Sequence, residues 1–592
     1  MDTIGLNEPQ GAPAAPLFPP TYRLGLLCLL IGVVGALAAL MFDFLVDQGQ
    51  RWLLEGLGGF KPPSSGELVP MVVIPEGWAR LWLPVVTTLG GLISGLLVYF
   101  LAPEAEGHGT DAAVSAYHHH GGRVRGRIPF VKGLASAVTL GSGGVAGREG
   151  PTAQIAVGLS SVIAKGLVLR GQERRILMLA AMAAGLAAIF QAPLGMAIFA
   201  VEILYSGMVF ESEALIYTVI SATTAYAIYG FFVGWTPIFA IPTGLAFHKP
   251  LALLGFAALG VLAGVLGAIL PSLFYGVREL FRRLPGPPHW KPALGGFLVG
   301  LLALAVPELL GAGYGWVELA LAGRLPWATL LLLLLLKGPA MSLTIGSGGS
   351  GGVFGPTVVL GAMLGAAVGM GVQQVLPAVG TAPAAFVVVG MAAVFAGAAR
   401  TPLSTLIMTA EMTGGYGLIV PAMLANVLAF AVQRSLTAGR RHPTLYESQV
   451  DGPEESPVHR GVFVRRALEM LEGGRLKRSE LTLPRLTSLL EYGDPIPVTR
   501  DGHGFLITVE LEEGSPLAGE TVATGLGTVA GLTAVAVLRG DEMTVPRGPT
   551  CLEAGDQIVA VATPEAHREL REKAVAPGSV PEETLSDRRT SP

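Results

Sequence analysis

One glutamate in this sequence lies at the start of an apolar stretch, in a chain whose apolar stretches otherwise carry little charge. Glu149 lies in the string Gly147-Arg148-Glu149-Gly150-Pro151, at the head of an apolar run. An ionisable side chain at membrane depth is costly and therefore indicates a function. Pro151 suits the first turn of a helix, and a helix start offers unpaired N–H groups and a positive dipole end that can hold an anion. A carboxylate there would compete with a soluble anion for the same donors, so the string predicts a gate.

The elements that must position this carboxylate are membrane-spanning helices. Of the 592 residues, 51% are hydrophobic and 14% are charged, and the mean hydropathy is +0.58. Several uncharged runs exceed the roughly 18 residues that suggest a membrane span. They include Leu24–Phe42, Leu81–Ala102, Ile176–Val201, Pro250–Val277, Gly355–Ala399 and Met412–Gln433. The run Gly355–Ala399 is too long for one helix and contains proline breaks, so we expect at least two segments there.

Charge and cysteine content exclude several classes of protein. The net charge of −4 gives no indication of nucleic-acid binding, and two cysteines, Cys28 and Cys551, exclude a disulfide framework. Basic residues gather in short loops and after the last span, which predicts a cytoplasmic C-terminal tail. We expect a multi-pass protein of the cell's inner (plasma) membrane. An intramembrane hydrolase using Glu149 would need a nucleophile or metal set, such as a helical His-Glu-x-x-His or a Gly-x-Ser-x-Gly. We expect neither motif in this chain, and therefore no enzyme, metal or cofactor.

The membrane region contains an internal repeat with three signatures in the same order. Its copies share an alanine-rich string ending in Pro-Leu, a glutamate nine residues after that proline, and an upstream Gly-x-x-Gly-Pro-Thr. The matched segments are Met182–Leu194 with Met391–Leu403, Glu202 with Glu411, and Gly147–Thr152 with Gly352–Thr357. Repeats interrupted by glycine and proline at matching positions indicate a transporter with its site near the membrane midplane.

The chain changes character after Tyr446. Residues 448–500 are polar and are expected to form a linker. Short strand-like runs follow at Phe505–Leu511, Leu532–Leu538 and Gln557–Val561, and Pro564–Ala574 is expected to form a closing helix. These features predict a small α+β module at 501–575, followed by a disordered tail at 576–592.

The module resembles a known regulatory domain. The stretch Glu513–Gly519, with Val545-Pro546 and Gly555-Asp556, is similar to the TrkA-C (RCK-C) subdomain of potassium-uptake regulators. This resemblance implies that an unidentified small ligand is a possible partner of the module.

The Gly147–Pro151 string, the matching Gly352–Pro356 string and the isolated Tyr446 together resemble the CLC family of chloride channels and chloride/proton exchangers. The resemblance covers about residues 22–447 and leaves residues 1–21 as an N-terminal tail. It implies an all-α polytopic membrane protein with two inverted repeats of tilted and broken helices, roughly 22–232 and 250–437. It also implies a homodimer with one chloride pathway in each subunit.

Carried over residue by residue, the resemblance makes Glu149 the gate. Backbone N–H groups of Gly150, Val353 and Phe354 and the hydroxyl of Tyr446 would contact the anion.

The family's usual GSGIP loop is altered in this chain. His108 replaces its serine and Asp111 replaces its proline. Two interpretations of His108 remain open: the imidazole donates an N–H to the anion, or it points elsewhere and the backbone binds.

A second departure concerns protons. Family exchangers often carry a glutamate immediately after the position of Glu202, and here that residue is Ile203. Glu202 with Glu149 would form the proton pathway, or water would reach Glu149 directly, or coupling would be lost. We expect chloride/proton exchange, with an uncoupled chloride channel as the alternative. Transport of another anion such as nitrate or fluoride is a remote alternative, and a larger anionic solute would call for more polar side chains at the midplane.

Three other charged or polar features have plainer interpretations. We expect Arg148 to pair locally or to face an aqueous vestibule, and Glu411 to be structural. The adjacent residues His118–His120 are expected in a solvated loop, because neighbouring side chains on a helix point in different directions and cannot share one metal.

Overall fold

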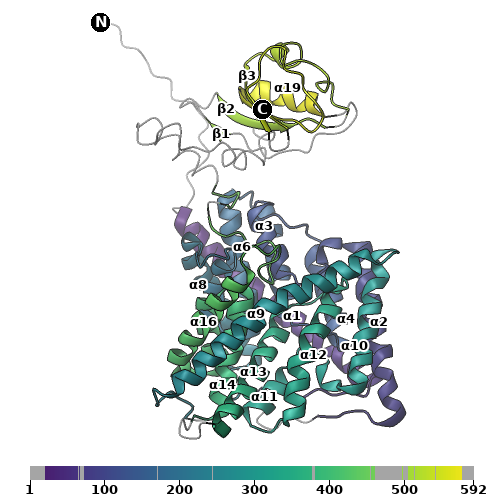
Figure 1. Ribbon diagram of the computed structural model, residues 1–592, viewed down its shortest axis with the longest axis vertical. Helices are drawn as coiled ribbons and strands as arrows, with labels where there is room; N and C mark the ends of the chain where they lie inside the picture. Colours follow the sequence, from purple (N-terminus) through teal and green to yellow (C-terminus); the bar gives the residue numbers. More distant parts are fainter. Residues whose placement is uncertain are drawn as a thin grey trace. The chain divides into compact units, whose positions relative to one another are not determined.

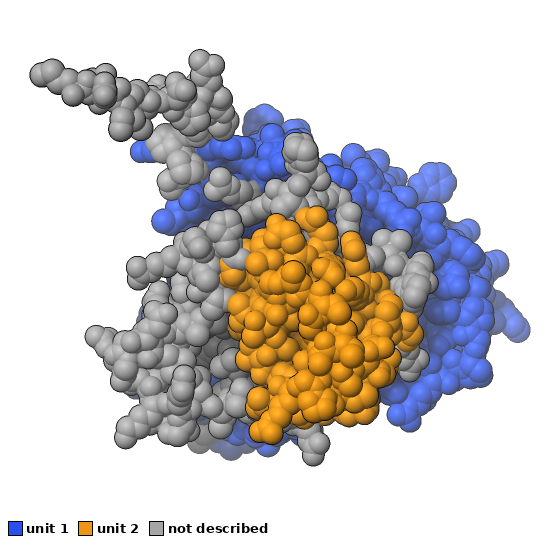
Figure 2. All heavy atoms as spheres, turned by 90° about the horizontal axis from the view of Figure 1, so that it is seen from above, with its two compact units in different colours: residues 1–453 blue, residues 454–592 orange. Residues whose placement is uncertain are grey.

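The structure is a computed structural model in which the chain divides after Pro453 into two compact units, coloured separately in Figure 2. It describes residues 20–64, 66, 72–169, 171–242, 244–375, 381–453, 455–459, 496–497, 504–512, 514–539 and 542–575. The expected N-terminal tail up to residue 19, most of the expected linker and the tail 576–592 lie outside these residues.

The first unit is helical, and its helices are inclined to one another (Figure 1). The first repeat contains α1 (Pro20–Gly49), α2 (Trp82–Leu101), α3 (Thr110–His118), α4 (Ile128–Gly141), α5 (Glu149–Gly166), α6 (Gly171–Phe190), α7 (Pro193–Glu202) and α8 (Ser212–Val233). The second contains α9 (Ala252–Arg283), α10 (Lys291–Ala305), α11 (Tyr314–Leu321), α12 (Trp327–Gly346), α13 (Phe354–Val375), α14 (Pro383–Ala399), α15 (Pro402–Thr413) and α16 (Ile419–Thr437). Seven helices of the described chain are long and apolar enough to cross a membrane. The expected polytopic helical fold is confirmed.

Both repeats contain a helix break at the same place. The run Ile176–Val201 is divided into α6 and α7, and the equivalent run is divided into α14 and α15. In each copy a residue with positive φ, Gln191 or Arg400, is followed by a residue that is not helical and then by proline. The residue before a proline avoids the helical region, so the proline stops the first helix and starts the second. Gly355–Ala399 likewise forms two helices, as expected.

The second unit is a small sheet with a helix. Its five strands have the order β1-β2-β5-β3-β4, with all neighbours antiparallel. Their bounds are β1 Ile496–Pro497, β2 Phe505–Glu510, β3 Leu532–Arg539, β4 Glu542–Thr544 and β5 Gln557–Ala562, and α19 spans Pro564–Ala574. Alternating residues such as Ile507 and Ile558 pack with Leu570 of α19. The three longer strands and the closing helix occur where they were expected, while β1 lies inside the stretch expected to be linker.

A buried carboxylate ties β3 to the turn before β5. The Asp556 side chain is fully buried, and its two oxygens accept hydrogen bonds from Arg539 Nε (2.8 Å) and Nη2 (2.9 Å). The N–H of Glu553 donates a third, at 2.8 Å. Burial alone raises the pKa of the Asp556 carboxyl, but these hydrogen bonds and the charge of Arg539 lower the pKa below its usual value.

Arg539→Met is expected to lower the melting temperature of fragment 454–592 by roughly 5 °C at pH 7, because it leaves a buried carboxylate without its ionic partner. A lowered folded-state pKa gives stability that is present above the ordinary pKa of Asp, about 4, and is lost as the pH falls through the folded value. Thermal unfolding followed by circular dichroism should therefore show the two proteins converging as the pH is lowered below about 4. A difference that stayed constant down to pH 2 would contradict this assignment.

Candidate functional site

Two helix starts meet at the predicted gate. Glu149 is the first residue of α5 and Phe354 is the first residue of α13. The loops before them form an antiparallel bridge, in which Gly147 N donates to Gly352 O (2.7 Å) and Gly352 N donates to Gly147 O (2.8 Å). The free N–H groups and positive ends of both helices therefore converge on one place, as an anion site requires.

The Glu149 carboxylate occupies this place. Its side chain is 2% exposed, and Oε1 accepts a hydrogen bond from the N–H of Gly355 in the first turn of α13. Oε2 has no hydrogen-bond partner among the described residues. Glycine is needed at position 355, because a Cβ there would lie 2.9 Å from the Tyr314 hydroxyl and 3.1 Å from Oε1. The carboxylate thus takes up a donor that a soluble anion could use.

A cavity of about 10 Å³ lies beside the carboxylate. Its lining is mostly apolar and includes three side chains with polar ends. The lining residues are Thr110, Glu149, Leu186, Phe190, Met196, Phe199, Phe354 and Tyr446. The structure therefore brings together Glu149, Phe354 and Tyr446, three of the residues selected from the sequence. Thr110, which sequence reasoning missed, joins them.

His108 is near this cavity but is not one of its lining residues. Its ring packs edge-on against Tyr446, with centroids 5.3 Å apart, and against Phe274 at 5.8 Å. The side chain is 7% exposed, and Nδ1 has no hydrogen-bond partner among the described residues. Its carbonyl accepts the N–H of Thr110 at 2.8 Å across Gly109, whose φ of +72° suits glycine. In this geometry the imidazole supports the ring of Tyr446.

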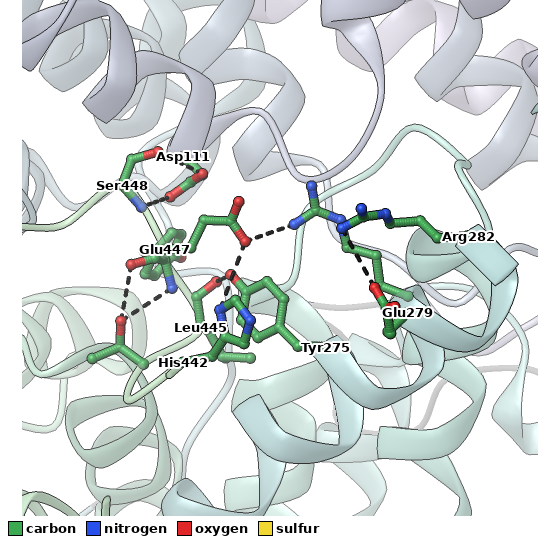
Figure 3. A network of polar contacts seen from close by, with 11 residues as sticks. Asp111, Tyr275, Glu279, Arg282, His442, Leu445, Glu447 and Ser448 are labelled. Carbon is green, nitrogen blue, oxygen red and sulfur yellow. Dashed lines mark hydrogen bonds and ion pairs between the residues drawn. The ribbon is translucent and has the colours of Figure 1, made fainter. Parts of the chain in front are cut away.

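The segment that carries Tyr446 is held by polar contacts on both sides (Figure 3). Asp111 accepts hydrogen bonds from the N–H and the hydroxyl of Ser448, both at 2.8 Å. On the other side, Tyr275 donates to Leu445 O (3.0 Å) and Arg278 pairs with Glu447 (2.7 Å). Asp111 replaces the family proline, but its partner is 337 residues away, so sequence reasoning could not have found the contact.

Two buried lysines brace the loops before α3 and α11. Lys132 Nζ donates to Ala105 O (3.0 Å) and Gly107 O (2.7 Å), and Lys337 Nζ donates to Leu309 O (2.8 Å) and Gly311 O (2.9 Å). Both side chains are fully buried. Sequence reasoning missed this pair, although a lone charged residue at the same place in each repeat was a signal that could have found it.

Each of the two repeated glutamates caps the start of the helix that carries the other glutamate. Glu202 accepts the N–H groups of Leu403 (3.1 Å) and Ser404 (2.8 Å), and also the Ser404 hydroxyl, at the start of α15. Glu411 accepts the N–H groups of Leu194 (3.2 Å) and Gly195 (2.8 Å), at the start of α7. Each glutamate thus satisfies donors that a helix start leaves open.

Ile203 is buried and its side chain has no polar group. Its N–H donates to Phe199 O (2.9 Å), and its carbonyl accepts a hydrogen bond from Gln449 Nε2 (3.0 Å).

Arg148 points to a second, larger cavity. It pairs with Asp43 (2.5 Å) and Asp47 (3.0 Å) of α1, and these residues line a cavity of about 590 Å³. It therefore has both features that were expected of it, an ion pair and a vestibule.

The three histidines differ from their expected setting. His119 and His120 are exposed, but the solvated-loop interpretation is wrong for His118. His118 ends α3 and is buried, and its Nε2 lies 3.1 Å from Leu204 O. The described residues contain no group of three or more His, Cys, Asp or Glu side chains that could hold a metal ion.

The expectation that the chain holds no Gly-x-Ser-x-Gly is wrong, because Ser350 lies in Gly348-Gly349-Ser350-Gly351-Gly352, a spacing that also surrounds hydrolase nucleophiles. Its hydroxyl donates to Ala105 O (2.9 Å) and lies 2.8 Å from the Ser136 hydroxyl. No histidine is among its hydrogen-bond partners in the described residues.

Two family models match this chain. The model described as voltage gated chloride channel matches residues 90–434, and the TrkA-C domain matches residues 506–574. The first match lies within the helical unit, and the second lies within the sheet module.

Curated relatives agree with the first model. A protein described as a ClcB-like chloride channel protein, from Ralstonia nicotianae, is 33% identical over 423 residues, which are 70% of this chain and 94% of the relative. The H(+)/Cl(-) exchange transporter ClcA of Yersinia pseudotuberculosis is 31% identical over 405 residues, which are 67% of this chain and 82% of the relative.

Solved structures agree with the fold. A slow cyanobacterial Cl−/H+ antiporter matches with a TM-score of 0.62 and 24% identity, covering 73% of this chain and 97% of the other. A CLC-type fluoride/proton antiporter matches with a TM-score of 0.60 and 20% identity, covering 73% and 98%.

Proposed function

This chain belongs to the voltage gated chloride channel (CLC) family and carries a TrkA-C domain, and from that premise we propose that it exchanges chloride for protons across a membrane. One observation carries the proposal: the Glu149 carboxylate is bound at the start of α13, where an anion would bind. The charged carboxylate and chloride would compete for the same N–H donors. The protonation state of Glu149 would therefore determine whether chloride occupies the site.

In the proposed cycle, Glu149 is alternately charged and protonated. While charged, it is held by the N–H of Gly355 and by the positive ends of α5 and α13. Protonation removes the charge and weakens this hold, so the side chain leaves and chloride takes its place. Chloride would then contact the N–H groups of Gly150, Val353 and Phe354 and the hydroxyl of Tyr446. Return of the carboxylate after proton loss expels the anion, and chloride and protons thus move in opposite directions.

The inner part of the proton route is proposed to use Glu202. If it does, Glu202→Gln should reduce proton flux relative to chloride flux about a hundredfold, at the lower end of the range that a positioned acid or base contributes. Its repeat partner gives a matched control, since Glu411→Gln removes the same kind of helix-capping carboxylate. Paired flux measurements on both variants would separate the two roles. Equal loss of coupling in both variants would show that Glu202 acts only as a cap.

An uncoupled chloride channel is the second candidate function, and Ile203 is the observation that favours it. This buried apolar side chain cannot relay a proton from the position where family exchangers often carry a glutamate. In a channel, Glu149 would open and close the pathway without moving protons through it.

Simultaneous chloride and proton fluxes from proteoliposomes distinguish the two functions. A chloride gradient that drives protons uphill is the expected result and identifies an exchanger. Chloride efflux without proton movement would identify a channel, and failure of chloride to move at all would overturn both. Competition by nitrate and fluoride in the same assay would report anion selectivity.

The proposed setting is the inner (plasma) membrane, with the chain assembled as a homodimer and the TrkA-C domain in the cytoplasm. We propose that this domain binds a small ligand that regulates transport.

A further inference from the structure

Thr110 has a hydroxyl group that no described residue engages. It is the first residue of α3, it is 4% exposed, and it lines the cavity between Glu149 and Tyr446. Two other threonines beside the site differ from it. Thr152 donates its hydroxyl to Arg148 O (2.8 Å), and Thr357 donates to Val353 O (2.7 Å), each within its own helix.

The backbone explains this difference. A threonine inside a helix can donate its hydroxyl to the carbonyl of the preceding turn. Thr110 has no preceding helical turn, because Gly109 turns the chain with a φ of +72°. In the same turn the N–H of Thr110 donates a hydrogen bond to His108 O (2.8 Å). The backbone amide of Thr110 is therefore hydrogen-bonded, while its hydroxyl is not.

The neighbouring imidazole does not compete for the position. The His108 ring packs against Phe274 and Tyr446, and the lining of the cavity includes Thr110 instead. The polar ends available to a ligand there are the carboxylate of Glu149 and the hydroxyls of Thr110 and Tyr446.

We infer that Thr110 is a direct ligand of the transported anion and supplies the side-chain hydroxyl in place of His108. The inference rests on the proposed function and assigns it a specificity-determining residue. A hydroxyl donates one hydrogen bond to a halide and carries no charge, so the anion is bound without being trapped. The paired hydroxyls of Thr110 and Tyr446 would hold the anion within the apolar lining when Glu149 leaves.

The test is equilibrium chloride binding to the purified full chain, measured by isothermal titration calorimetry. Thr110→Val keeps the shape and removes the donor, and it is expected to weaken chloride binding about tenfold. Thr110→Ser keeps the donor and should bind within about twofold of the wild type. The matched control is Thr87→Val in α2, which removes a buried hydroxyl bonded to its own helix and should leave binding unchanged.

The outcomes separate this inference from the proposed function. A wild-type chain that binds no chloride would overturn the proposed function itself. Wild-type binding that is equally strong in Thr110→Val would overturn the role of Thr110 alone. If Thr110→Val does not yield a monodisperse protein, crystals of the wild type grown in bromide decide the matter. An anomalous peak within hydrogen-bond distance of Thr110 Oγ1 is expected, and a peak that contacts His108 but not Thr110 would refute the assignment.

Discussion

Replacing Glu149 with glutamine is expected to reduce proton flux to the level of empty liposomes while chloride continues to pass. Glutamine has nearly the same shape but cannot take up and release a proton in this pH range. Its amide also lacks the full charge that the N–H of Gly355 and the two helix starts hold in place. The side chain should therefore yield to chloride at any pH, and chloride flux should lose its dependence on pH.

The measurement is chloride and proton flux recorded together from proteoliposomes containing wild type or Glu149→Gln. Glu318→Gln provides the control, because Glu318 is also a buried carboxylate that accepts backbone N–H groups, from Gly66 (2.9 Å) and Ala240 (3.0 Å). It should keep both fluxes. Proton movement that is unchanged in Glu149→Gln would remove Glu149 from the proton route.

The site residues that lie within short sequence motifs could be predicted from the sequence. Glu149 and Phe354 stand in glycine-proline strings at two helix starts, and such strings dictate local backbone by themselves. The helical repeat was visible for the same reason, since each copy carries its breaks at matched prolines. The longer strands of the module were visible because each is a short run rich in apolar residues, and turn signals such as Arg539-Gly540 and Ala554-Gly555 separate the runs.

The remaining parts depend on contacts between distant segments or on one turn of the backbone. Asp111 meets Ser448 only after the chain has folded, because 337 residues separate them. The resemblance to the family places His108 at the family's serine, but Gly109 has a φ of +72° and the structure puts Thr110 at the cavity. The strands β1 and β4 have two and three residues and are too short to be recognised as strand-like runs in the sequence.

The second large effect is expected from the buried lysines. Lys132→Met should lower the free energy of unfolding by about 1–3 kcal/mol, because it removes two hydrogen bonds of about 0.5–1.5 kcal/mol each. Ala105 O keeps the Ser350 hydroxyl (2.9 Å) as a donor, and Gly107 O keeps the N–H of Gly351 (3.2 Å). Methionine has a similar volume, so this loss does not include a large cavity. Lys337→Met removes two hydrogen bonds in the other repeat and should cost at least as much, because no second donor to Leu309 O or Gly311 O is found among the described residues.

The two variants should differ in transport, and this difference tests the role of the loop. Lys132 braces the loop that leads into Thr110 at the cavity, whereas Lys337 braces the loop before α11. We expect Lys132→Met to reduce chloride flux more than Lys337→Met when both variants are assayed at a temperature at which they remain folded. Thermal unfolding in detergent measures the stability of each variant, and flux assays below the melting temperature measure its transport. Lys165→Met is the control, because Lys165 is exposed. If Lys132→Met unfolded at the temperature of the control, its bonds to the loop would contribute nothing to the fold, and the loop would have to be positioned by Gly109 and Asp111.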